Sequence, residues 1–286
     1  MDKTVIPAFE RNHLWDDTER LNECGKFINA IECNDCKTKH FIGFRRCKNR
    51  FCTKCAYIRS LSWLAVLMPI LKAWIDQGNH LQLLTLTVRD GMYLEERLKF
   101  ITNAWRTFYS GSSIREHWKD TFPGGLRSLE VKIGKGSGIW HPHIHCLVMK
   151  DNYSRDYPWL KERWKQLTDD NGSVHIKGLN TSNLLKSTAE TVKYIIKPEE
   201  SIYKDDMKFN QLYYALKGRR QVSTWGLLRG IREQDLEEAL ETLDEKKLEH
   251  FICSQCGCSE GELKAYLFDE IKKEQLFNIS IPKQIN

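Results

Sequence analysis

The sequence lacks several features that would assign it to a membrane, secreted or repeat protein. It has no charged and then apolar leader, so we expect no secretion and a cytoplasmic location. Its most apolar run, Leu61–Ile75, is too short to span a bilayer and contains Pro69 and Lys72, which predicts a buried helix and no membrane partner. It also has no internal repeat, no low-complexity tract and no G-x4-G-K-[ST] phosphate-binding loop.

What remains is the composition of a folded chain with a mildly basic surface. The 286 residues are enough for one large domain or two modest ones, and 41% of them are hydrophobic. Lys and Arg number 44 against 38 Asp and Glu, which gives a net charge of +6 and suggests a polyanionic partner. Ten cysteines in a chain that is not exported are expected to bind metal or to stay reduced.

The order of predicted elements indicates an α+β fold with helices against a central antiparallel sheet. Two strands joined by the Gly-rich turn Gly134–Gly138 predict an antiparallel hairpin. The predicted strands are Leu81–Arg89, Leu126–Ile133, His143–Met149 and Ser173–Leu179. The predicted helices are Met92–Gly111, Asp156–Thr168 and one from Thr181 to just before Pro198.

Four regions follow from these patterns. Residues 1–22 are a polar lead-in, and residues 23–60 form a cysteine-rich module that is too poor in apolar residues to fold on a core alone. Residues 61–204 carry the α+β domain. Residues 205–286 are predicted to be mostly helical, with one amphipathic helix at Glu233–Phe251.

Three alternating histidines, His141, His143 and His145, mark the second strand of the hairpin. Side chains two apart share a face of a strand, so His143 and His145 lie together, while Ile144, Cys146 and Val148 face the core. The hairpin register brings Glu130 across from His143 or His145. Two imidazoles and a carboxylate suit a divalent cation with open positions, although hydrogen-bonded histidines on a polar sheet face are the alternative.

The predicted helix after Thr181 carries a polar face opposite its apolar stripe. Glu190, Tyr194 and Lys197 lie at i, i+4 and i+7, so they can touch one another. A tyrosine beside a lysine and a metal is a plausible nucleophile, and Glu190 could act as a general base. A solvated helix face with an incidental tyrosine is the alternative.

The cysteine-rich module has the spacing of a four-cysteine zinc ribbon. Cys33-x2-Cys36 and Cys52-x2-Cys55 are separated by residues 37 to 51, and Cys47, Cys24 and His40 are possible substitutes. The segment Cys253–Cys258 is half a site, which either binds a second zinc with a distant ligand or binds nothing.

The same module is basic and aromatic, which suits phosphate contact and base stacking, with a plain solvated surface as the alternative. The residues are Arg45, Arg46, Lys48, Arg50 and Lys54, interleaved with Phe41, Phe44 and Phe51.

Together these motifs resemble the HUH endonucleases, and within them the rolling-circle replication initiators of small bacterial plasmids. "LLTLT" (Leu83–Thr87) is similar to their first motif, "HPHIHCLV" (His141–Val148) to the metal motif, and "ETVKYIIK" (Glu190–Lys197) to the tyrosine motif. "CKNRFCTKC" (Cys47–Cys55) resembles the Cys-x2-Arg-x-Cys-x2-Cys signature of one subgroup, except that Thr53 replaces a frequent proline. The resemblance covers roughly residues 24–220.

The resemblance implies a role for each residue. His143 and His145 would hold Mg²⁺ or Mn²⁺ with Glu130 as the third ligand, and Tyr194 would cut one DNA strand and keep its 5′ phosphate. In that subgroup a glutamate replaces a second tyrosine, so Glu190 would assist the closing hydrolysis, while Lys197 would support the nucleophile.

The implied substrate is a single-stranded or hairpin origin in the cytoplasm of a bacterial host. Without a phosphate-binding loop, unwinding would need a host helicase. The C-terminal part could dock that helicase, bind DNA or form a homodimer.

Other functions explain fewer of the motifs. A histidine-triad nucleotide hydrolase would use His141 with His143 and His145 but leaves the cysteines and the Tyr194 face unexplained. A zinc-ribbon regulator explains residues 23–60 alone. A transposase or a conjugative relaxase would share the chemistry and differ in the DNA recognised.

Overall fold

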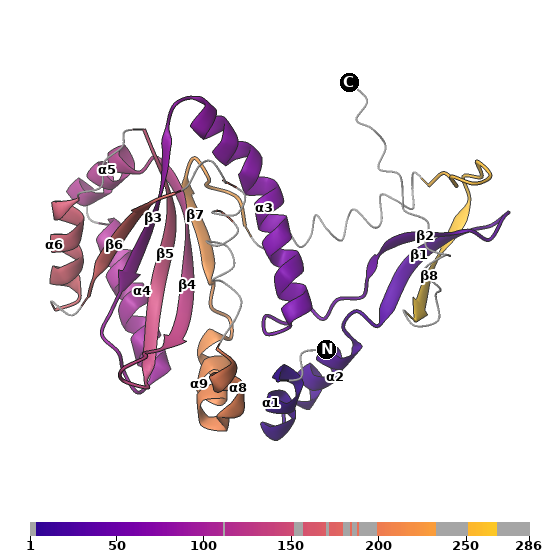
Figure 1. The fold of residues 1–286 in the computed structure, drawn as a ribbon, viewed down its shortest axis with the longest axis horizontal. Coiled ribbons are helices and arrows are strands. Elements are labelled where there is room, and N and C mark those ends of the chain that lie inside the picture. The colour runs from indigo at the N-terminus through magenta and orange to yellow at the C-terminus, as the bar shows by residue number, and fades with distance from the viewer. Residues whose placement is uncertain are drawn as a thin grey trace. The chain divides into compact units, whose positions relative to one another are not determined.

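The computed structural model describes residues 4–110, 112–151, 157–169, 172–179, 184, 188, 199–232 and 251–267. The chain divides into two compact units, which are described separately (Figure 1). Unit 1 comprises residues 1–55 together with 234–286, and unit 2 comprises residues 56–233. Unit 1 is therefore built from both ends of the chain, with unit 2 inserted between them.

Unit 2 is organised around a five-stranded antiparallel sheet in the order β6-β3-β5-β4-β7. Its strands are β3 (His80–Thr87), β4 (Gly124–Ile133), β5 (Trp140–Lys150), β6 (Val174–Gly178) and β7 (Val222–Gly226). Four of the five agree with the predicted strands to within a few residues, and β7 lies in a region predicted to be helical. The α+β class with a central antiparallel sheet is confirmed.

The hairpin β4–β5 has the register that the sequence predicts. The chain turns through Gly134–Gly138, where Gly138 takes a φ of 69° that an L side chain adopts only with strain. Glu130 pairs with His143, and Ser128 pairs with His145. Because neighbouring strands place paired residues on the same face, this register puts Glu130 among the histidines.

The opposite face of the sheet is the main core of unit 2. Ile144, Cys146 and Val148 are fully buried there, as predicted. Figure 1 shows helices α4 (Leu94–Ser110), α5 (Ser112–Thr121) and α6 (Pro158–Leu167) on one side of the sheet. Trp118 of α5 is fully buried, and its ring lies 4.8–5.7 Å from four other aromatic rings, those of Trp105, Phe108, Phe122 and Trp225. Aromatic packing of this kind fixes the helices on the sheet.

Helix α3 (Thr53–Asp76) corrects the expectation of a buried helix. Only one stripe is fully buried, formed by Trp63, Leu67 and Leu71 at four-residue spacing, while Leu61 is 46% exposed. Among the described residues α3 is the one helix long and apolar enough to cross a membrane, with 22% of its most apolar window buried. A single helix of this kind is weak evidence for a membrane span, since core helices share these properties.

The expectation of a separate helical C-terminal region is not met in the described residues. Helices α8 (Glu200–Lys204) and α9 (Asp206–Leu216) are followed by β7, and all three belong to unit 2. Strand β8 (Gly261–Leu267) belongs to unit 1. The helix predicted at Glu233–Phe251 lies outside the described residues except for Phe251.

Unit 1 contains two helices and a small sheet that the sequence pattern did not reveal. The polar lead-in contains α1 (Val5–Arg11) and α2 (Trp15–Glu23), because three buried side chains, Val5, Phe9 and Leu21, are enough to anchor them. β1 (Phe27–Cys33), β2 (Lys39–Phe44) and β8 pair in the antiparallel order β2-β1-β8. The strand that completes this sheet, β8, comes from the far end of the chain, in a region that the sequence analysis expected to be mostly helical.

Candidate functional site

The three histidines of β5 share one face of the sheet in unit 2. The ring centroids of His141 and His143 lie 4.2 Å apart, and those of His143 and His145 lie 5.7 Å apart and stacked. His145 is buried, and the side chain of His143 is 14% exposed. The pairing of His143 and His145 predicted from strand alternation is therefore what the structure has, with His141 continuing the row.

Glu130 lies at the centre of this group, on the neighbouring strand β4. Its Oε2 atom is 2.8 Å from His145 Nε2 and 3.8 Å from His143 Nδ1, and its Oε1 atom is 3.0 Å from Lys132 Nζ. Burial acts to raise the pKa of Glu130, but hydrogen bonds with His145 and Lys132 outweigh burial and lower it. The carboxylate is thus held in its charged form beside the imidazoles.

His145 is oriented from both of its ring nitrogens. Nε2 bonds to Glu130, and Nδ1 lies 3.0 Å from the Oγ1 atom of Thr85 on β3. Thr85 pairs with His145 across the two strands, so the sheet itself supplies this contact. A fixed ring is what a ligand or a proton-transfer group requires.

The ring of His143 is in a state that suits metal binding. Burial, followed by repulsion from His141, lowers its pKa to about 4, which leaves the ring neutral at ordinary pH. Its Nδ1 atom is buried and has no hydrogen-bond partner among the described residues. A buried nitrogen without a partner is costly unless something else binds it.

His141 and Asp90 extend the site in a way that the sequence analysis did not use. His141 Nδ1 forms an ion-pair contact with Asp90 Oδ1, and Asp90 also accepts a hydrogen bond from Ser137 in the hairpin turn. The sequence analysis placed only His143 and His145 on this face, because the strand that it predicted begins at His143. Asp90 follows β3 after two residues, and no local signal linked it to β5.

The tyrosine helix cannot be placed against this group. Glu190, Tyr194 and Lys197 lie outside the described residues, so their predicted roles stay predictions. Two other tyrosines, Tyr213 and Tyr214, lie on α9, and Tyr214 is 61% exposed.

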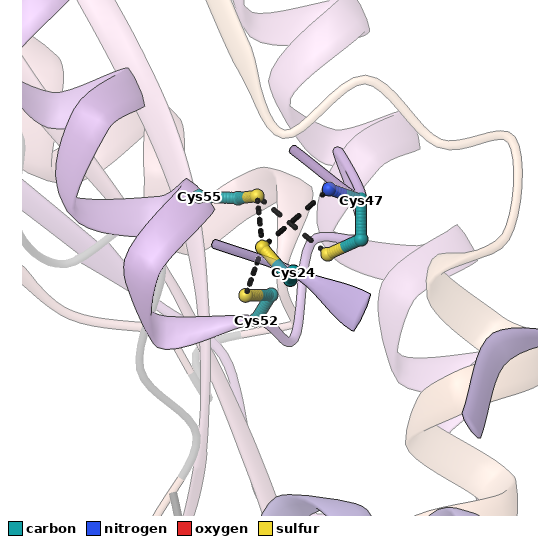
Figure 2. A group of neighbouring side chains, drawn as sticks. All are labelled: Cys24, Cys47, Cys52 and Cys55. Atoms are coloured by element: carbon teal, nitrogen blue, oxygen red, sulfur yellow. Dashed lines mark hydrogen bonds between the residues drawn. The ribbon is translucent and has the colours of Figure 1, made fainter. Parts of the chain in front are cut away.

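In unit 1 the cysteines form two groups, and the predicted single ribbon of Cys33, Cys36, Cys52 and Cys55 is wrong. In the first group, Cys52 and Cys55 meet Cys24 and Cys47, and all four sulphurs lie within 4.8 Å of one another (Figure 2). Cys24 and Cys47, considered only as substitutes, are full members. The prediction that C-x2-C pairs contribute to the groups was correct, but Cys33-x2-Cys36 does not lie with Cys52-x2-Cys55.

All four cysteines of the first group are buried. The Cys24 sulphur lies 3.5 Å from that of Cys55 and 3.6 Å from that of Cys52, and the backbone N–H of Cys47 donates to it. Interaction with the Cys47 thiol, and after it with Cys55 and the Cys47 backbone N–H, lowers the pKa of Cys24 to about 7, although Cys52 and burial act to raise it. Four buried sulphurs at mutual contact are the donor set of a closed tetrahedral zinc site.

The second group joins Cys33 and Cys36 to Cys253 and Cys256, again within 4.8 Å of one another. The half site near the C-terminus therefore has its distant partner in the β1–β2 turn. His40 belongs beside this group, with Nε2 at 3.3 Å from the Cys253 sulphur.

The basic residues predicted to contact DNA surround the first cysteine group. Arg45, Lys48 and Lys54 are exposed, and Arg46 and Arg50 are half-buried. Phe44 is 42% exposed, and its ring centroid lies 5.1 Å from that of Phe41, whereas Phe51 is buried against Phe9. A hollow of about 220 Å³ beside them is lined by Arg20, Arg45 and Arg46 and by two carboxylates, Glu19 and Glu23.

Comparison with known proteins decides the family. A family model described as "Replication protein" matches residues 39–258, more than half of the chain, and spans the histidine strand and the first cysteine group from Cys47 onward. The chain belongs to this replication protein family. This confirms the family resemblance noted from the motifs.

Curated replication proteins from several bacteria are similar to this chain. "Protein rep" of Streptococcus pneumoniae is 27% identical over 234 residues, covering 76% of this chain and 71% of that protein. "Protein rep" of Lactiplantibacillus plantarum is 28% identical over 225 residues, covering 71% and 70%. "Protein rep" of Staphylococcus aureus is 23% identical and covers 66% and 86%. No solved structure matches the chain.

Proposed function

We propose that this replication protein initiates rolling-circle replication of a plasmid by cutting one strand of its origin in a metal-dependent reaction. The observation that carries the proposal is the face of β5 and β4, where His143 and His145 converge on Glu130. Family membership supports a role in replication, and the histidine face supports phosphodiester chemistry.

The residues of the site fit a divalent cation. His143 and His145 with Glu130 would hold Mg²⁺ or Mn²⁺, and the buried, unpartnered Nδ1 atom of His143 is the observation that favours a ligand there. A bound cation would supply positive charge that neutralises a phosphodiester under attack. His141 beside His143, with Asp90 behind it, is a second candidate for the third ligand.

Tyr194 would be the nucleophile. Its phenol oxygen forms a bond to the phosphorus of the scissile diester, the bond from that phosphorus to the 3′ oxygen breaks, and the phenol proton finally resides on the freed 3′ hydroxyl. The product is a 5′-phosphotyrosine link that keeps the energy of the diester for rejoining. Lys197 would stabilise the phenolate, and Glu190 would activate the water or hydroxyl that later releases the strand.

Unit 1 would bring the DNA to this chemistry. Zn²⁺ held by Cys24, Cys47, Cys52 and Cys55 would fix the loop that carries Arg45, Arg46, Lys48 and Arg50 and the start of α3, which carries Lys54. Exposed cations on a rigid loop contact phosphates without large ordering costs. The implied substrate is a single-stranded or hairpin origin, with a host helicase and a second copy of the chain as further partners.

The test is the covalent adduct itself. The full chain is incubated with single-stranded origin DNA and Mn²⁺, denatured and digested, and mass spectrometry identifies the residue that carries the nucleotide. We expect Tyr194 to carry it. Tyr194→Phe should abolish nicking and the adduct while DNA binding remains, and Tyr214→Phe is the matched control that should change neither.

An adduct that persists in Tyr194→Phe would move the reaction to another tyrosine. Glu190→Ala should nick normally but accumulate the adduct, and normal turnover by this variant would exclude Glu190 from the closing step. To separate the two candidates for the third ligand, we compare Mn²⁺ affinity in Glu130→Ala and His141→Ala. The variant that loses more affinity identifies the ligand.

A transposase or a relaxase with the same chemistry is less well supported, because the family match is to replication proteins. A histidine-triad hydrolase would need His141 as a member of its triad and would leave no protein–DNA adduct. Formation of the adduct therefore excludes the hydrolase, whereas a transposase or a relaxase would form the adduct too and would differ in the DNA recognised.

A further inference from the structure

The second cysteine group brings together two short turns from opposite ends of the chain. Cys33 and Cys36 lie at the turn between β1 and β2, and Cys253 and Cys256 lie in the turn that precedes β8. The sulphurs of Cys33 and Cys256 are 3.5 Å apart, as are those of Cys36 and Cys253, although these pairs are separated by 223 and 217 residues.

The two turns have the same backbone conformation. Each is a C-x2-C sequence in which the residue after the second cysteine donates its N–H to the carbonyl of the first, Lys37 to Cys33 and Gly257 to Cys253. That residue has a positive φ in both turns, 58° at Lys37 and 75° at Gly257. This conformation turns consecutive N–H groups toward one point and makes a concave site for sulphur or another anion.

The first cysteine group shares one feature of these turns, a positive φ directly after a cysteine, although the N–H of Gly25 bonds to the carbonyl of Arg45 and not to that of a cysteine. Gly25 follows Cys24 with a φ of 71°, and Lys48 follows Cys47 with a φ of 56°. Two of the four non-glycine residues with positive φ in the described chain are thus lysines directly after a clustered cysteine. Such strain costs of order 1–3 kcal/mol and persists where the surroundings require it. The shared conformation indicates a shared purpose for the two groups.

The apolar core around the second group is too small to hold these turns together. It consists of Ile31, Cys33, Ile42, Phe251 and Cys253, with Cys258 packed against it. Closing a loop of more than 200 residues costs chain entropy. The pairing of β8 with β1 opposes this cost, and a cross-link between the two turns would oppose it further.

We propose that Cys33, Cys36, Cys253 and Cys256 bind a second Zn²⁺, which clasps the C-terminal strand β8 to the N-terminal hairpin. Four thiolates suit a soft, tetrahedral cation and not the Mg²⁺ or Mn²⁺ expected in unit 2. His40 Nε2 lies 3.3 Å from the Cys253 sulphur, within hydrogen-bond distance. Residues that hydrogen-bond to zinc ligands in this way orient those ligands. The family match begins at residue 39, after Cys33 and Cys36, so it does not assign this site.

Zinc content measures the clasp directly, and it does not depend on the proposed nicking reaction. Native mass spectrometry of the unmodified full chain should show two zinc ions per chain. Cys256→Ser should retain one, and the double variant Cys36→Ser/Cys256→Ser should also retain one, because both changes act on one ion. Combining Cys256→Ser with Cys55→Ser should leave none.

The matched control is Cys258→Ser. Cys258 lies in the same turn, and its sulphur accepts a hydrogen bond from the backbone N–H of Glu260, so this variant should keep both ions. Hydrogen exchange in Gly261–Leu267 should speed up in Cys36→Ser as much as in Cys256→Ser, although Cys36 is far away in sequence.

Three results would overturn the clasp. One is a single ion in the unmodified chain, and another is a Cys256→Ser variant that keeps two ions. The third is a disulfide between the two turns, seen in the denatured chain as a mass lower by two hydrogen atoms, together with one ion per chain in the native spectrum. The count on the unmodified chain decides the matter even if a variant fails to fold.

Discussion

The two units of the chain divide its cysteines and tryptophans almost completely. Unit 1 holds every cysteine except Cys146, which is nine of ten, and unit 2 holds every tryptophan except Trp15, which is eight of nine. Unit 2 is stabilised by large rings packed between helices and a five-stranded sheet. Unit 1 has a three-stranded sheet and two groups of clustered sulphurs.

The contrast shows that a large unit and a small unit of the same chain are stabilised in different ways. Unit 2 is one continuous segment with enough apolar surface to fold on its core. Unit 1 gathers about a hundred residues from two segments, and its small core needs cross-links of another kind. The unit with the thin core is also the one that carries the basic residues around Cys47.

Zinc removal should produce the largest difference in structural stability between the two units. Structural zinc sites contribute about 10 kcal/mol or more of folding free energy, so a strong chelator should unfold unit 1. Unit 2, which contains neither cysteine group, should keep its structure. Hydrogen exchange should become fast in β1 (Phe27–Cys33) and stay slow in β5 (Trp140–Lys150). Equal loss of protection in both strands would contradict the division.

A core substitution should produce the reverse pattern. Trp118→Ala removes a fully buried ring that contacts four other aromatic side chains, and we expect it to lower the free energy of unfolding of unit 2 by about 3–5 kcal/mol. Zinc content should not change. Trp15→Ala is the matched control, because Trp15 is 59% exposed and its removal should cost less than about 0.5 kcal/mol. Urea unfolding followed by tryptophan fluorescence measures both.

A pH effect should appear in unit 2 through His143. Its pKa is about 4 in the folded chain and 6.5 ordinarily, so below pH 6.5 the unfolded state takes up the proton first. The stability contributed by the neutral ring is therefore complete above pH 6.5 and is lost as the pH falls toward 4, by at most about 3 kcal/mol. His143→Gln should flatten this part of the pH profile, whereas an unchanged profile would show that burial does not hold the ring neutral.

The smallest effect should come from an exposed ion pair. Lys204 Nζ and Glu200 Oε1 are 2.9 Å apart on α8, but both side chains are more than 60% exposed. Exposed pairs of this type contribute about 0.3–0.5 kcal/mol. Lys204→Ala should therefore leave the urea midpoint of unit 2 almost unchanged, and a loss above about 1 kcal/mol would reveal a contact that this pair does not explain.

The sequence was most informative for the β4–β5 hairpin, where strand alternation and turn residues determine structure over a short stretch of chain. The alternation of Leu129, Val131 and Ile133 with polar residues, and the glycines of the turn, were enough to predict that Glu130 faces the histidines. His141 was not placed on this face because the predicted strand began at His143, and its partner Asp90 comes from a different loop and carries no pattern.

The sequence was least informative where contacts join distant segments. Spacing alone allows Cys33-x2-Cys36 to pair with Cys52-x2-Cys55, and only the three-dimensional fold shows that Cys253 and Cys256 take that place. The partner of strand β8 could not be found for the same reason, since β1 lies more than 200 residues away. Helices α1 and α2 were missed because the polar composition of residues 1–22 obscures the few side chains that these helices bury.

The discontinuity of unit 1 also sets an order of events during translation. Cys36 leaves the ribosome 217 residues before Cys253, which at 5–20 residues per second is roughly 10 to 40 s. The whole of unit 2 is synthesised within that interval. A nascent chain therefore carries a finished sheet domain and an open N-terminal hairpin until its last segment emerges, so an initiator cut short by early termination would lack the strand that closes unit 1.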